Sequence, residues 1–210
     1  MDPHRISTAE QLREVVGEEL PLAQAKVFSE IEETAEAFIR ASPFLLLSTA
    51  DAAGNIDVSP KGDPAGFVRV EDPKTLVIPD RTGNKMVLGH LNVLQNPKVG
   101  MIFFVPGTPE TLRLSGVAEL SRDPSLLASM EARGQPAVLA MRVHVEEVFF
   151  HCPKAFMRSK LWEPASWGER RRISMGKLIA KRLQKDEKFA QAIDDFTEES
   201  RQELAKRIRG

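Results

Sequence analysis

Cysteine and long apolar runs are both scarce in this sequence, and each shortage narrows the class of protein. Cys152 is the single cysteine among 210 residues, which excludes an intramolecular disulfide framework and a cysteine-rich zinc site and favours a reducing compartment. No apolar run approaches the roughly 20 residues that cross a bilayer, and the N-terminal segment lacks the apolar centre of a signal peptide. We therefore expect a soluble, cytoplasmic protein.

An excess of charge of one sign is also missing. The chain has 29 lysine and arginine residues and 30 aspartate and glutamate residues, a formal net charge of -1, so no chain-wide attraction to nucleic acid or to an anionic membrane is expected. The run Arg170-Arg171-Arg172 does not change this, because such a run usually begins a solvated helix. Any ionic ligand must be bound by a local cluster of charges.

Two helices are predicted ahead of the first strand. Ser7 and Glu10 have the spacing of a capping box, so residues 8–16 are predicted to form a short helix that Gly17 ends. In residues 22–40, apolar side chains recur at helical intervals with acidic residues between them, which predicts a longer amphipathic helix on a core. A chain of this length fits one folded domain with appended helices.

From residue 43 the pattern changes to short β-branched or alternating segments separated by turn residues, which predicts a mostly antiparallel barrel. Residues 84–95 interrupt the strands with a helical pattern that Asn96-Pro97 ends. Two amphipathic helices, residues 173–183 and 188–208, are predicted after the last strand. The predicted strands are residues 43–50, 56–60, 66–70, 75–79, 99–105, 111–120 and 138–150.

The segment Ser59-Pro60-Lys61-Gly62-Asp63 is the first candidate site. It places a hydroxyl, an ammonium group and a flexible glycine within four residues, and together these could hold an anion. The same residue types also make ordinary turns, since Ser-Pro and Gly-Asp are common turn dipeptides. On the residues alone both interpretations stand.

The second candidate is Pro79-Asp80-Arg81-Thr82-Gly83-Asn84-Lys85, between a predicted strand and the start of the inserted helix. A helix N-terminus offers unpaired N–H groups and partial positive charge, and an arginine adds a planar fork suited to two phosphate oxygens. These pieces suit a phosphate monoester. The alternative is a capped loop in which Asn84 is the N-cap and Arg81 pairs with Asp80 or with solvent.

Arg113 is the third candidate, within the strand pattern Thr111-Leu-Arg113-Leu-Ser115-Gly116. Alternation places Arg113 on the face that Thr111 and Ser115 share, and this face is either solvent-exposed or the wall of a polar pocket. An exposed arginine on a strand is the more common case.

Four sequence motifs occur in order from Pro43 onward and together resemble one family. They read PFLLLSTAD..G..DVSPKGDPAGFV, PDRTGNK......N...NPKVGMIFFVPG, ETLRLSG and CPKAFMRSKLW. The sequence resembles the pyridoxamine 5'-phosphate oxidase-like family, in its subgroup of FMN-dependent enzymes, over about half of the chain. The four motifs in this order are far more specific than any one of them.

The resemblance implies a mainly β fold with α-helices, namely a six-stranded antiparallel split β-barrel with N-terminal and C-terminal helices. Residues 1–42 would be helices packed on the barrel, residues 43–151 the FMN-binding barrel and residues 152–210 a C-terminal helical extension, all in one folded domain. The resemblance also implies a homodimer with two FMN molecules in clefts at the subunit interface, so that each site draws on both subunits.

The cofactor contacts also follow from the resemblance. Ser59 and Lys61 would contact the flavin ring or the phosphate, and the second candidate segment would contact the phosphate and the ribityl chain, whose charge its cations would neutralise. Arg113 would complete the cleft and the C-terminal motif would close it. The residues implied are Ser59, Lys61, Asp80, Arg81, Gly83, Asn84, Lys85, Arg113, Lys154, Arg158 and Trp162.

No metal site is predicted. His151 and Cys152 are adjacent, but neighbours on a strand point to opposite faces and no further cluster of metal ligands accompanies them. His90, on the inserted helix, is interpreted as a structural residue.

The resulting hypothesis is an FMN-dependent oxidoreductase that passes hydride or electrons between a reduced donor and a small organic molecule. Three alternatives remain: a non-catalytic FMN-binding or storage protein, a haem- or deazaflavin-binding relative on the same barrel, and an interaction protein that uses its charged C-terminal helices. The final residues AKRIRG lack the arginine-containing tail and terminal proline of the oxidase itself, which argues against pyridoxamine phosphate as the substrate. No dinucleotide-binding glycine fingerprint identifies the donor.

Overall fold

The computed structural model describes residue 2, residues 4–83 and residues 85–209, and the chain forms two compact units. The first unit consists of the chain up to Met130 together with Ala137–Trp162. The second consists of Glu131–Pro136 and the chain from Glu163 onward. The predicted division of one domain at residues 42 and 151 stays a prediction.

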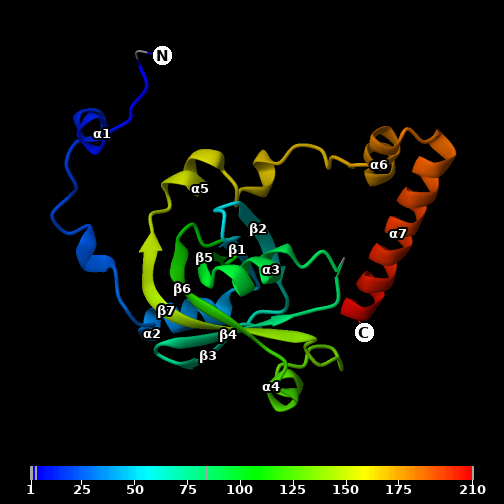
Figure 1. The fold of residues 1–210 in the computed structure, drawn as a ribbon, viewed down its shortest axis with the longest axis horizontal. Coiled ribbons are helices and arrows are strands. Elements are labelled where there is room, and N and C mark those ends of the chain that lie inside the picture. Colours follow the sequence, from blue (N-terminus) through cyan, green and yellow to red (C-terminus); the bar gives the residue numbers. More distant parts are fainter. Residues whose placement is uncertain (1, 3, 84, 210) are drawn as a thin grey trace. The chain divides into compact units, whose positions relative to one another are not determined.

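An antiparallel sheet of seven strands makes up most of the first unit (Figure 1). The strands follow one another across the sheet in the order β2-β1-β5-β6-β7-β4-β3. This confirms the predicted mainly antiparallel fold, with one strand more than the six that the resemblance implies. The strands are β1 (Phe44–Ala50), β2 (Ile56–Gly62), β3 (Arg69–Asp72), β4 (Thr75–Asp80), β5 (Lys98–Phe104), β6 (Thr111–Ser121) and β7 (Leu139–His151).

Alternation along β1 divides the sheet into an inner and an outer face. Leu45 and Leu47 are buried, whereas Phe44 on the opposite face is 39% exposed. On the inner face the two leucines join the main hydrophobic core, to which β5 contributes Phe103 and helix α2 (Glu33–Ala41) contributes Ile39. Removal of these side chains from water is the main force that holds the sheet curled around the core.

The register of β2 places its polar side chains on the inner face. Ser59 lies opposite Leu47 and Lys61 lies opposite Leu45 in the β1–β2 pairing. Residues directly opposite each other on antiparallel strands share a face of the sheet. Ser59 and Lys61 therefore project toward the side on which the core lies, where polar groups need hydrogen-bonding or charged partners.

Prolines occur in two strands near opposite ends of the sheet. Pro60 lies within β2, the first strand in the sheet order, and Pro79 lies within β4, the last but one. The carbonyl of Asp80 accepts a hydrogen bond from the N–H of Val138 at 3.1 Å, so the backbone of the neighbouring Pro79 is directed away from β7. Proline has no N–H to donate, and Pro79 lies beyond Val77, the last residue of β4 that pairs with β3.

Helix α1 (Ala9–Val16) forms where the sequence predicts it. Its N-cap is Thr8 rather than Ser7, because the Thr8 hydroxyl accepts a hydrogen bond from the backbone N–H of Gln11 at 3.3 Å. Gly17 ends the helix with φ 82°, a left-handed conformation that glycine adopts without a steric penalty.

Residues 22–40 do not form one helix, so that prediction is wrong over its first half. The short 3-10 helix η1 (Gln24–Lys26) is followed by extended chain in which Phe28 forms a β-bridge with Val148 of β7. α2 (Glu33–Ala41) begins only after this bridge. Backbone pairing with the sheet overrides the helical periodicity, since tertiary contacts routinely outweigh helix propensity.

The inserted helix α3 (Leu88–Gln95) starts later than predicted. Lys85 and Val87 have φ values of 61° and 47°, so the chain before the helix is left-handed at two positions. That conformation costs a non-glycine residue roughly 1–2 kcal/mol, and it is a particular outlier for the β-branched Val87. The prediction that Asn84 caps the helix lies outside the described residues.

Two short helices complete the first unit. α4 (Pro124–Ser129) follows β6, and α5 (Lys154–Ser159) follows β7. Phe156 of α5 approaches Phe104 of β5, with ring centroids 5.9 Å apart.

The second unit contains the two predicted C-terminal helices, which pack on each other. A Cβ on Gly176 would lie 1.9 Å from the carbonyl oxygen of Ala190, so only glycine allows this approach. Asp194 accepts a hydrogen bond from the backbone N–H of Gly176 at 2.7 Å. No helix among the described residues is long and apolar enough to span a membrane. The elements are η2 (Pro164–Ser166), α6 (Met175–Leu183) and α7 (Glu187–Arg209).

Candidate functional site

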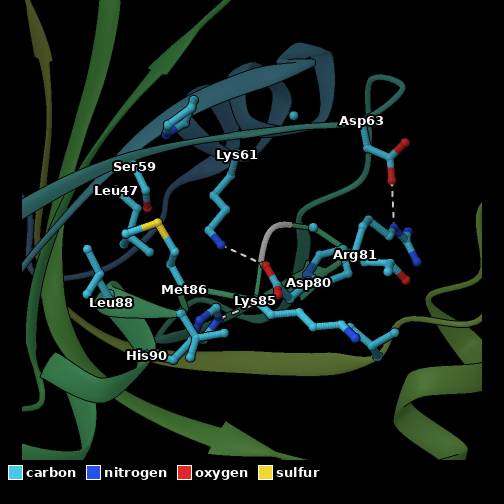
Figure 2. A pocket seen from close by; sticks show the side chains of 18 of the residues that line it. Leu47, Ser59, Lys61, Asp63, Asp80, Arg81, Lys85, Met86, Leu88 and His90 are labelled. Atoms are coloured by element: carbon cyan, nitrogen blue, oxygen red, sulfur yellow. Dashed lines mark hydrogen bonds and ion pairs between the residues drawn. The ribbon is translucent and has the colours of Figure 1, made fainter. Parts of the chain in front are cut away.

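A cavity of about 640 Å³ lies between β2, the end of β4 and the start of α3 (Figure 2). The two segments that the sequence marks as separate candidates both line it, so they form one site. Asn84 lies outside the described residues. The predicted cofactor residues in the cavity wall are Ser59, Lys61, Asp80, Arg81, Gly83 and Lys85.

Two ion pairs join the walls of the cavity (Figure 2). Lys61 Nζ lies 2.7 Å from Asp80 Oδ1, and Arg81 Nε lies 2.8 Å from Asp63 Oδ2. The first pair connects β2 with the last residue of β4. The second pair connects the residue directly after β2 with the residue directly after β4. The two strands are not neighbours in the sheet order. We call this junction of β2 with the end of β4, bridged by the two ion pairs, the seam.

Arg81 has hydrogen-bonding capacity that the described residues leave unused. Its Nη1 atom is buried, yet no described residue accepts a hydrogen bond from it. A buried donor without an acceptor costs about 1–3 kcal/mol, so such atoms are rare in native proteins. Nη1 therefore marks a place where an acceptor on a ligand would be favourable.

The formal charges of the cavity wall balance, but they are not all engaged with each other. Two of the three cations are paired across the seam. Lys85 is exposed and forms no ion pair with any described residue. An anion in the cavity would therefore meet Lys85 as well as the unused edge of the arginine. The charged residues are Lys61, Arg81 and Lys85 against Asp57, Asp63 and Asp80.

The start of α3 forms the remaining polar wall. Its first turn lines the cavity, and a helix N-terminus carries unpaired N–H groups and partial positive charge. Gly89 brings the helix close to the sheet, since a Cβ there would lie 3.4 Å from both Asp57 Oδ2 and Thr49 Oγ1. The Asn92 amide donates a hydrogen bond to Thr49 Oγ1 at 3.1 Å, which fixes the helix on β1.

His90, interpreted from the sequence as a structural residue, also lines the cavity. Its Nε2 lies 3.8 Å from Asp80 Oδ2, and its side chain is only 11% exposed. Burial lowers the pKa of His90 below its usual value, an effect that the Asp80 carboxylate opposes and the Lys61 ammonium reinforces. His90 is therefore held in its neutral form near pH 7.

The remaining predicted residues do not line this cavity. Arg113 lies on the outer face of β6, with its guanidinium 5.3 Å from the centroid of the Phe149 ring. Trp162 stacks on Phe156 and donates from Nε1 to the carbonyl of Thr108 at 2.9 Å. Both cations of α5 are solvent-exposed. Lys154, Arg158, Trp162 and Arg113 are thus not brought to the cavity within one chain.

The described residues contain no group of three histidine, cysteine, aspartate or glutamate side chains that could hold a metal ion. Cys152 is exposed and has no disulfide partner. His151 lies opposite Thr111 in the pairing of β7 with β6.

Among the cavity-wall residues that were not predicted from the sequence, Asp63 and His90 each contact a predicted residue, Arg81 and Asp80 respectively. Asp63 lies in the first candidate motif but has no assigned role there, and His90 has only its position one turn into the inserted helix to indicate it. Both become visible once the seam brings β2 and β4 together.

Comparison with known proteins supplies the family. Residues 31–152 match the model of the pyridoxamine 5'-phosphate oxidase family, and no curated protein sequence matches the chain. HupZ from Group A Streptococcus has a similar structure, with 21% identity, TM-score 0.47, and coverage of 57% of this chain and 93% of that chain. A Lactobacillus delbrueckii protein provisionally described as a pyridoxamine 5'-phosphate oxidase has 25% identity, TM-score 0.45, and coverage of 58% and 95%. An FMN-binding protein from Syntrophomonas wolfei has 12% identity, TM-score 0.43, and coverage of 57% of this chain and 85% of that chain.

The TM-scores are modest, so the assignment depends on the match to the family model. That match covers more than half of the chain. It also includes every residue that lines the cavity, from Leu47 to Val138. The chain belongs to the pyridoxamine 5'-phosphate oxidase family.

Proposed function

We propose that the chain binds FMN in the cavity at the seam and acts as an FMN-dependent oxidoreductase on a small organic molecule. One observation carries the proposal: an arginine donor and a lysine, neither of which has a partner among the described residues, converge with a helix N-terminus on one cavity. Its volume of about 640 Å³ lies within the range of about 300–1,000 Å³ that is usual for ligand and cofactor sites.

The phosphate of FMN fits the end of the cavity near Arg81. The unused Nη1 donor of Arg81, the ammonium of Lys85 and the first N–H groups of α3 would each meet a phosphate oxygen. Charge-assisted hydrogen bonds from such groups are stronger than neutral ones, and helix N-termini are common phosphate sites. Arg81 stays paired with Asp63 through Nε, so binding does not require that ion pair to break.

The wall between β2 and α3 suits the rest of the cofactor. Ser59 and Lys61 supply polar groups for ring or ribityl oxygens, and apolar side chains such as Leu47, Phe67 and Met86 supply a surface for the ring. Bound FMN would supply hydride and electron transfer. The protein's part is to hold the phosphate, orient the ring and keep His90 neutral beside it.

We further propose a homodimer in which a second copy completes each site. The outer face of the sheet presents apolar side chains such as Ile56 and Val58 of β2, which are 74% and 56% exposed. Exposed apolar residues gathered on one face often mark an interface. The predicted residues outside the cavity, on β6 and from α5 onward, would then reach the cavity of the partner subunit.

The spectrum of the protein purified without added cofactor tests this proposal. Flavin absorption and release of FMN by acid are expected. A Soret band would indicate haem, and a released deazaflavin would indicate that cofactor instead. Turnover of NADH or NADPH with an electron acceptor separates an enzyme from an FMN storage protein. Colourless protein that also ignores added FMN would contradict the cofactor assignment.

The variant Arg81→Ala tests the phosphate site. We expect it to lose bound FMN while its circular dichroism spectrum stays that of the wild type. Arg40→Ala is the matched control, because Arg40 pairs with Glu36 on the exposed face of α2, and it should keep its flavin. Unchanged flavin occupancy in Arg81→Ala would contradict the proposed site.

A further inference from the structure

Asp63 is a nearly buried carboxylate beside the cavity, and the cofactor contacts proposed above give it no role. Its side chain is 3% exposed. Its backbone N–H donates to the carbonyl of Pro43 at 3.2 Å, which ties the residue to the segment just ahead of β1. Asp63 is therefore a fixed point at the edge of the cavity.

Stability alone is a weak explanation for a carboxylate in this place. Removal of a charged group from water is expensive, and attraction to a partner often does no more than offset that cost. A buried aspartate beside an arginine is thus a poor way to hold a fold together, and it calls for another function.

The arginine atom that Asp63 contacts indicates what that function is. Arginine presents its donors in a rigid planar fork, so a hydrogen bond from Nε restricts where the other donors of the guanidinium can lie. Asp63 accepts from Nε at 2.8 Å, while Nη1 of the same group has no acceptor among the described residues. The carboxylate holds one edge of Arg81 and leaves another edge for a ligand.

We propose that Asp63 is a positioning residue for the phosphate of the flavin cofactor: it orients Arg81 through Nε so that Nη1 meets a phosphate oxygen. This inference rests on the proposed FMN-binding function and deepens it. Riboflavin lacks the phosphate of FMN. The protein would therefore distinguish FMN from riboflavin partly through a side chain that contacts neither flavin.

Through its negative charge Asp63 also weakens FMN binding, which opposes its positioning effect. The two effects can be measured separately. Its negative charge partly offsets the attraction of Arg81 for a phosphate, so removal of the charge alone would tighten FMN binding. Asparagine keeps a carbonyl acceptor in the place of Oδ2 without the charge, whereas alanine removes both the acceptor and the charge. The pair of variants therefore distinguishes positioning from charge.

The experiment measures dissociation constants of FMN and of riboflavin for the full-length protein stripped of flavin. Asp63→Ala should weaken FMN binding about tenfold or more, the size expected when a partner that orients a ligand-binding group is lost. The Asp63→Asn variant should bind FMN at least as tightly as the wild type does. Riboflavin binding should be unchanged in both variants, and in the Arg81→Ala background Asp63→Ala should cause no further loss of FMN.

Three results would overturn the inference. Asp63→Ala could bind FMN as tightly as the wild type or more tightly, which would mean that charge outweighs positioning. Asp63→Ala could lose affinity for FMN and for riboflavin equally, which would mean that Asp63 only supports the fold. The Asp63→Asn variant, which keeps the acceptor, would then still measure the effect of the charge on FMN binding. Failure of the wild type to bind either flavin would overturn the proposed function itself, and this inference with it.

Discussion

Lys61 and Asp80 lie at opposite ends of the strand order, yet their charged atoms are 2.7 Å apart. Lys61 belongs to β2, the first strand in that order, and Asp80 ends β4, the last but one. The curled sheet brings its ends together at the seam, and side chains close the junction. The candidate cofactor site is therefore also the place where the barrel is joined.

The Lys61–Asp80 ion pair should be energetically coupled. Lys61→Met leaves a largely buried carboxylate without its partner and Asp80→Asn leaves a largely buried ammonium, so each single variant should lower the free energy of unfolding. The double variant should be less destabilised than the sum of the two. Because both side chains keep some solvent contact, at 17% and 23% exposure, we expect a coupling of about 1–2 kcal/mol. Urea unfolding of all four proteins measures it, and additive losses would mean that the pair does not stabilise the seam.

The stability of the protein should fall between pH 7.5 and pH 5.5 in part because of His90. Burial lowers the pKa of His90 in the folded chain, so the unfolded chain takes up a proton first as the pH falls. The contribution of neutral His90 is complete above the unfolded pKa of about 6.5 and is lost as the pH falls through the folded pKa. Urea unfolding over this pH range should show a shallower fall for His90→Gln than for the wild type.

The Asp80 carboxylate should raise the pKa of His90 against the effect of burial. Asp80→Asn removes that opposing interaction, so the His90 pKa should drop further below its usual value. NMR titration of the His90 ring protons measures this directly. An unchanged or higher pKa in the variant would show that the carboxylate does not act on the ring across 3.8 Å.

Gly116 should not tolerate any side chain. It follows the irregularity in the pairing of β6 with β7, and a Cβ there would lie 2.1 Å from the carbonyl oxygen of His144. Gly116→Ala should therefore lower the free energy of unfolding by about 2–3 kcal/mol, as overpacking of a core does. Gly168→Ala is the control, because a Cβ on Gly168 meets nothing within 4 Å. Equal unfolding midpoints for the two variants would contradict the close approach.

The proposed homodimer should show complementation between subunits. Arg81→Ala removes a group in the cavity, and Arg158→Ala removes an exposed group on α5 that would serve the partner's cavity. Each variant alone should bind FMN weakly. In a mixed dimer one site carries both changes and the other carries none, so random mixing should restore about one quarter of all sites. Flavin absorbance per protomer measures this, and no recovery on mixing would place Arg158 outside the site.

The strands could be predicted from the sequence because their signals are local. A segment such as residues 111–120 has alternation and flanking turn residues of its own. In the structure it forms β6, which pairs with β7 in the antiparallel sheet. The helical periodicity of residues 22–40 gave a wrong prediction because it is also a local signal. The bridge from Phe28 to Val148 joins residues far apart in the chain, and no local pattern reports such a contact.

The candidate site could be predicted in its parts but not in its connections. The residue types around Lys61 and Arg81 indicate anion binding in two separate motifs. The partners of these cations follow from the curl of the whole sheet, so the pairing of Arg81 with Asp63 could not be predicted. The place of Arg113 on the outer face depends on the same curl.

Pro60 gives the edge of the sheet a further consequence. β2 is the first strand in the sheet order, so one of its sides has no strand beside it, and such a side is a template for association with other chains. Pro60 removes a donor from the strand, which weakens such association. A ligand that bridges the seam would add a stabilisation that grows with the logarithm of its concentration. With FMN as that ligand, as proposed above, a shortage of flavin would leave a larger fraction of the protein open to aggregation and proteolysis.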